Sequence, residues 1–132
     1  MAKAYRKLIE ALLEDMTSTG SFKYAAATTL TIASGAITAT QVVHTVEGEG
    51  AASDTLYTIN GGAENQTLIL YPETAGNLIT LGHSSGNIVI AGDVDYEIPV
   101  NGFVILLYDG TNWRMMSAGT NEITLEEAWA YA

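Results

Sequence analysis

The sequence predicts a mainly β protein, an antiparallel sandwich or barrel-like module with an N-terminal amphipathic helix and a short C-terminal helix. Short apolar runs rich in Ile, Val and Leu recur along the middle of the chain. Glycine, asparagine, aspartate and serine separate these runs, which is typical of strands joined by tight turns. Apolar residues at helical spacing return near both ends of the chain.

The sequence divides into three parts. We predict a helical arm and linker over residues 1–23, a β domain over residues 24–120 and a helical tail over residues 121–132. In the tail, Thr124 and Glu127 fit a capping box, which favours a helix that starts there. Leu125 and Trp129 fall on one face of this helix and are expected to form an interface with another surface.

An apolar stripe predicts the N-terminal helix over residues 3–16. Basic residues stand at its start and acidic residues at its end, which is the arrangement that the helix dipole disfavours. A helix this short is also marginal alone in water, so it needs a packing partner. That partner is either its own sheet or a neighbouring subunit. The predicted interface residues are Tyr5, Leu8, Ile9, Leu12, Leu13 and Met16.

The strands follow in order. In residues 24–40, Leu30 and Ile32 alternate with threonines, as in a half-buried strand. Two near-copies, Gly76-Asn77-Leu78-Ile79-Thr80-Leu81-Gly82 and Gly86-Asn87-Ile88-Val89-Ile90-Ala91-Gly92, predict one hairpin. Further strands are expected in residues 41–46, 54–60, 66–71, 103–108 and 113–117.

A second hairpin is predicted at Asp109-Gly110, because both residue types tolerate the positive φ of tight turns. The structural turn residues are Asp109, Gly110, Asn112 and Trp113, with Trp113 packed on the sheet rather than stacked on a sugar. The preceding run, Phe103–Tyr108, is apolar throughout instead of alternating. Such runs are usually covered on both faces, so we expect a second sheet or a second subunit over it.

Charge is unevenly distributed along the 132 residues, whose net charge is −10. Residues 24–132 hold twelve acidic residues and one basic residue, Arg114, whereas residues 1–23 hold four basic and three acidic ones. An acidic body repels phosphate groups, so we expect no nucleic-acid partner. No apolar run reaches the length of about 20 residues that spans a bilayer, so no membrane partner is expected.

Catalytic and metal-binding motifs are absent from the sequence, so we expect no enzyme and no cofactor. The chain has no cysteine, and its two histidines, His44 and His83, are far apart. Asp93, Asp95 and Glu97 alternate and would share one face of a strand, where they could bind Ca²⁺. The favoured alternative is a solvated sheet edge that resists aggregation, with no metal.

Residues 76–117 carry a resemblance to a known class of proteins. The segments are Gly86-Asn87-Ile88-Val89-Ile90-Ala91-Gly92 and Leu106-Leu107-Tyr108-Asp109-Gly110-Thr111-Asn112-Trp113. They resemble small β-rich virion proteins and fibre segments of tailed bacteriophages. The resemblance implies a virion surface protein, typically a trimer. It does not extend to the helical ends.

We therefore expect a non-enzymatic bacteriophage structural protein that decorates or cements the outer surface of a capsid. Its expected partners are itself, as a homotrimer, and the major capsid protein or another virion protein. We expect the chain to be complete, and its short length favours decoration over a longer fibre. One alternative is a fibre or spike component that contacts a host receptor or glycan, and a second is a cellular carbohydrate-binding β-module.

Overall fold

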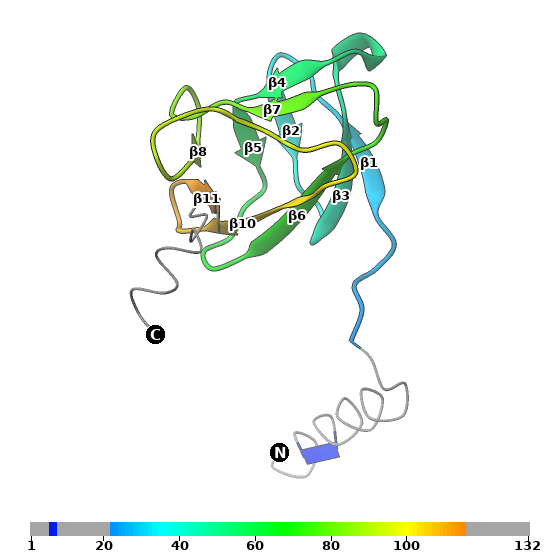
Figure 1. Ribbon diagram of the computed structural model, residues 1–132. Helices are drawn as coiled ribbons and strands as arrows, with labels where there is room; N and C mark the ends of the chain where they lie inside the picture. Colours follow the sequence, from blue (N-terminus) through cyan, green and yellow to red (C-terminus); the bar gives the residue numbers. More distant parts are fainter. Residues whose placement is uncertain (1–5, 8–21, 116–132) are drawn as a thin grey trace, which may run out of the picture.

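The computed structural model describes residues 6–7 and 22–115, and nearly all the regular secondary structure of this part of the chain consists of short strands (Figure 1). In chain order the elements are β1 (Thr28–Thr31), β2 (Ala36–Thr38), β3 (Val43–Glu47), the 3-10 helix η1 (Glu49–Ala51), β4 (Asp54–Leu56), β5 (Thr58–Asn60), β6 (Thr67–Pro72), β7 (Ile79–Leu81), β8 (Ile88–Val89), β9 (Tyr96–Glu97), β10 (Val104–Tyr108) and β11 (Trp113–Met115).

The strands stack in parallel, in the manner of a solenoid. β3 lies between β1 and β6 and runs parallel to both, with Val43 opposite Ile69. β2 pairs in parallel with β5, and β4 with β7. The chain therefore passes along the same faces in successive circuits, first as β1 and β2, then as β3, β4 and β5, and then as β6, β7 and β8.

The last strands turn back and cover this stack. β9 runs antiparallel to β7, and β10 runs antiparallel to β6. β10 then forms a hairpin with β11, which lies parallel to β8. The result is a six-stranded sheet in the order β1-β3-β6-β10-β11-β8, with β2-β5 and β4-β7-β9 as the other sheets (Figure 1).

The mainly β class is confirmed, but the antiparallel sandwich or barrel is wrong, since five of the eight strand pairings within residues 22–115 are parallel. The hairpin predicted between residues 76–82 and 86–92 is also wrong. β7 pairs with β4 and β9, and β8 pairs with β11. A short apolar run bounded by glycine shows that the chain turns, but the turn serves a solenoid corner as well as a hairpin.

The strand predicted over residues 54–60 is divided by a corner at Tyr57 into β4 and β5, which belong to different sheets. Tyr57 donates its backbone N–H to Gly35 O at 2.8 Å, in the circuit before it. In the circuit after it, Gly86 approaches so closely that a Cβ atom there would lie 2.1 Å from Tyr57 O. Only glycine fits this approach, and it sets how tightly the circuits stack.

The interior is filled by one cluster of buried side chains, with Trp113 fully buried among them. Its other members are mostly aliphatic, as expected for strands whose inward positions face a common core. They are Ile32, Ile37, Ala39, Val46, Leu56, Ile59, Leu68, Leu70, Ile79, Leu81, Ile88, Ile90, Ile98, Val104, Leu106 and Met115.

The side chain of Asn87 joins β5 to β8, where no backbone ladder does. Its Oδ1 accepts the Ile59 N–H at 2.8 Å, and its Nδ2 donates to Ile59 O at 2.8 Å. Its backbone N–H reaches Tyr57 O at 3.1 Å, and its own carbonyl accepts the Trp113 N–H at 2.7 Å. One asparagine thus satisfies the free edge of β5 and ties it to both β8 and β11.

The predicted N-terminal and C-terminal helices lie almost wholly outside the described residues. Of the first, the structure describes Arg6 and Lys7, which have α-helical backbone conformation and are exposed. The division of the chain at residues 23/24 and 120/121 stays a prediction. No helix in the part of the chain that the structure describes is long and apolar enough to cross a membrane.

We predict that Asn87→Ala lowers the free energy of unfolding by about 1–3 kcal/mol, because it leaves the buried N–H of Ile59 without a partner. The matched control is Asn77→Ala, from the similar Gly-Asn segment. Asn77 donates one hydrogen bond to Ala51 O on the exposed surface, so its loss is expected to cost at most about 0.5 kcal/mol. Urea denaturation measures both, and equal effects would contradict the role given to Asn87.

Candidate interaction surface

The outer face of the six-stranded sheet is apolar and only partly covered. Val43, Ile69 and Ile105 stand side by side on β3, β6 and β10, and each is half-buried. Along β10 the burial alternates, because Val104 and Leu106 point into the core. The outer side of the predicted two-sided run is open in a single chain, with Phe103 62% and Leu107 36% exposed.

A groove of about 650 Å³ lies on this outer face. It follows the end of β6 and the segment that leads into β10. Most of its lining is apolar, and Tyr71 and Phe103 supply two aromatic rings. The lining residues are Val43, Ile69, Tyr71, Pro72, Glu73, Ala75, Asn101, Gly102 and Phe103.

The groove lies in an acidic body. The Glu73 carboxylate lines it and accepts a hydrogen bond from Thr29 Oγ1 at 3.1 Å, while Thr29 Oγ1 accepts one from Thr45 Oγ1 at 2.8 Å. Arg114 is the one basic residue of residues 24–115, and its Nε donates to Asp109 Oδ2 at 2.7 Å. A basic partner segment would therefore meet a favourable field near the groove.

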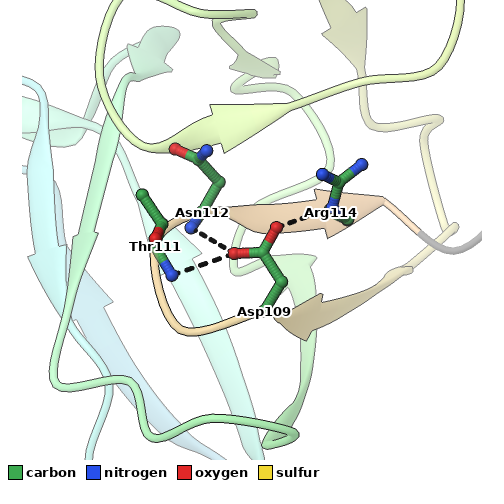
Figure 2. Close-up of polar contacts among 4 residues, drawn as sticks. All are labelled: Asp109, Thr111, Asn112 and Arg114. Atoms are coloured by element: carbon green, nitrogen blue, oxygen red, sulfur yellow. Dashed lines mark hydrogen bonds and ion pairs between the residues drawn. The ribbon is translucent and has the colours of Figure 1, made fainter.

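Figure 2 shows the turn between β10 and β11, which forms the hairpin that Asp109-Gly110 predicts. Asp109 Oδ1 accepts the backbone N–H groups of Thr111 at 2.9 Å and of Asn112 at 2.7 Å. Its Oδ2 accepts the Arg114 Nε–H. Gly110 has a φ of +96°, a conformation that side chains with a Cβ rarely adopt.

These contacts lower the pKa of Asp109 from 3.8 to about 2. The backbone N–H of Asn112 contributes most, followed by the Arg114 side chain and the Thr111 N–H. All three favour the charged carboxylate. Asp109 has a structural role in the turn, since each of its hydrogen-bond donors comes from the same hairpin.

Trp113 is fully buried, and its Nε1–H donates to Ile59 O at 3.1 Å. Its ring lies beside Tyr108, with centroids 5.0 Å apart. The ring packs in the core, as the sequence suggests, and its face is not open to a sugar.

The three alternating carboxylates do not share a strand face. Asp93 has a φ of +57°, and only Glu97 of the three lies in a strand, β9. Asp95 Oδ1 accepts the His83 N–H at 2.8 Å, and Asp93 Oδ1 lies 3.3 Å from His83 Nε2. A bend that packs on His83 replaces the expected strand. Among the described residues, no group of three or more His, Asp or Glu side chains is placed to hold a metal ion.

His44 is also structural. It is fully buried, and its Nε2 accepts the backbone N–H groups of Thr40 at 3.1 Å and Gln41 at 3.2 Å. The proton therefore belongs on Nδ1, which lies 3.1 Å from Thr28 O and 2.9 Å from Thr28 Oγ1. The ring joins β1 to β3 and to the turn that precedes β3, with no nitrogen left for a ligand.

The predicted interface residues Tyr5, Leu8, Ile9, Leu12, Leu13, Met16, Leu125 and Trp129 lie outside the described residues. The groove was missed by sequence reasoning. Its residues come from β3, β6 and the approach to β10, and the unbroken apolar runs at Phe103–Tyr108 and Leu68–Tyr71 were the signals in the sequence that pointed to this face. Neither a family model nor a curated protein nor a solved structure matches this chain.

We predict that Asp109→Asn lowers the free energy of unfolding relative to the wild type at pH values above about 4, and that this difference disappears on acidification. A carboxylate with a depressed pKa stabilises the fold above its unfolded pKa, here 3.8, and the gain disappears as the pH falls through about 2. The amide still accepts backbone N–H groups but carries no charge for Arg114. The Tm difference between wild type and variant should therefore shrink from about pH 5 to about pH 2. A difference independent of pH would contradict this assignment.

We predict that Gly110→Val costs about 1–3 kcal/mol, because a β-branched residue is strained at positive φ. Gly76→Val is the matched control, since Gly76 has open space around it and no such φ. Thermal melts should separate the two variants clearly, and an unchanged Tm for Gly110→Val would rule out the strain.

Proposed function

We propose that this chain is a non-enzymatic structural protein of a bacteriophage virion, which decorates the outer surface of the capsid and stabilises it as an oligomer. The observation that carries this proposal is the partly exposed apolar face of the six-stranded sheet, with Val43, Ile69 and Phe103 on it. Exposed apolar patches of this kind are typical of protein–protein contacts.

The resembling segment, residues 76–117, supports the choice of a virion. Its described part forms β7 and β8, which end the last parallel circuit, and β9 to β11, which reverse direction and cover the stack. Four polar groups of the body are bound to neighbouring backbone or side-chain groups: Asp109, Asn87, His44 and His83. They have structural roles, which favours an assembly protein over an enzyme.

A second candidate function is a fibre or spike component that contacts a host receptor or glycan. The observation that favours it is the pair of aromatic side chains, Tyr71 and Phe103, beside Asn101 and Glu73 in the groove. Aromatic rings stacked on sugar faces and planar polar groups are common in glycan sites. The mostly apolar lining favours a protein partner, so this function ranks second. A cellular carbohydrate-binding module ranks third, because Trp113 is buried.

Sedimentation with capsids tests the proposal. Full-length protein is mixed with capsids of the encoding phage that were assembled without it. We expect saturable binding and a higher capsid melting temperature, because an added layer of contacts links neighbouring capsomers. Binding to host cells or to a glycan array, with no binding to capsids, would contradict decoration and support the second candidate.

A further inference from the structure

The groove on the outer sheet face needs an occupant, because its exposed apolar side chains are costly to leave in water. Phe103 is the most exposed of the lining residues that are large and apolar, at 62%. Val43 and Ile69 form the floor, from adjacent strands in register. The occupant should therefore present an apolar face. Because the body is acidic, an occupant with basic residues beside that face is favoured.

We propose that this groove binds the apolar stripe of residues 5–16 from a second copy of this chain. The stripe comprises Tyr5, Leu8, Ile9, Leu12, Leu13 and Met16, which the sequence places on one helical face. Helix-in-groove docking is a common way for such a face to be buried. The exchange of arms between copies would produce the oligomer that the proposed function includes. This inference rests on the proposed function only in assuming that oligomer.

Charge complementarity supports this occupant. Glu73 lines the groove, and the body from residue 24 onward holds one basic residue, Arg114, which is bound to Asp109. The arm brings Lys3, Arg6 and Lys7 next to its stripe. Of the segments of this chain, the arm therefore combines an apolar face with the sign of charge that the groove favours.

The course of the chain ahead of β1 favours a second copy over the same copy. Ala26 is held by Gln41, whose Nε2 donates to its carbonyl at 2.7 Å. Ahead of it, the chain runs away from the β body (Figure 1), and Phe22 and Tyr24 are 69% and 46% exposed. Residues 22–25 thus lead away from their own sheet, and an arm attached there would have to reverse this direction to reach the groove of the same chain.

Site-directed cross-linking tests the pairing, and the chain is suited to it because it has no cysteine of its own. Leu12→Cys and Phe103→Cys are made in separate full-length chains that carry tags of different mass. After the chains are mixed and oxidised, or treated with a short bismaleimide, we expect a cross-linked product that holds one of each. Val94→Cys replaces Phe103→Cys in the control, because Val94 is similarly exposed, at 60%, and does not line the groove.

A charge placed at either partner should break the same contact. Phe103→Asp and the double variant Leu8→Asp with Leu12→Asp are each expected to lower the light-scattering mass to the 14.0 kDa of one chain, whereas Val94→Asp keeps the wild-type mass. Mixing the two defective proteins should restore a complex, since one supplies an intact arm and the other an intact groove. This recovery also shows that both variants are folded.

Three results would overturn the proposal. They are a wild-type protein that is monomeric at micromolar concentration, a cross-link that forms equally at Val94→Cys, and a cross-link that forms only within a chain carrying both Leu12→Cys and Phe103→Cys. The last result would assign the groove to the arm of the same chain. None of these measurements involves a capsid, so failure here is distinguishable from failure of virion binding.

Discussion

The hydrogen bonds between Asn87 and Ile59 join two neighbouring circuits of this small solenoid, at β5 and β8, where no backbone ladder connects them. Where the edge of a strand is buried in a stack of circuits, its backbone groups need hydrogen-bond partners. β5 has β2 on one side, and on the other side the amide of Asn87 takes the place of a strand. Trp113 adds its indole N–H to the same carbonyl, so the core's largest side chain is fixed by the same group.

The contacts of Gly86, Asn87 and Trp113 show how a local turn fixes the position of one circuit against the next. Gly86 brings the chain against the backbone of Tyr57, and Asn87 then reaches Ile59, so adjacent residues set the distance and the pairing of two circuits. Trp113 follows the Asp109 turn and donates its backbone N–H to the Asn87 carbonyl. The hairpin turn at Asp109 therefore positions β11, which carries Trp113, against Asn87.

Local chemistry was predictable from the sequence, and long-range pairing was not. Asp109-Gly110 predicts its hairpin because the dipeptide itself carries the required conformations. The strand segments were also placed well, since apolar runs show where strands lie. The alternation of apolar and polar residues shows only which side chains face inward, however. It does not show whether the neighbouring strand is parallel or antiparallel. Asn87 follows a glycine and resembles a turn residue, so nothing local distinguishes it from Asn77, which binds a surface loop.

The groove has the same long-range origin, and the change of strand direction explains where it lies. The ladder between β6 and β10 ends where Val104 stands opposite Leu70. Beyond that point β6 continues along β3 through Tyr71 and Pro72, while the chain entering β10 bends at Asn101, whose φ is +62°. Proline is tolerated at such an edge because it has no N–H to leave unpaired. The reversed strand is no longer paired with β6 beyond Val104, and Phe103, the residue before it, lies exposed at the open apolar groove.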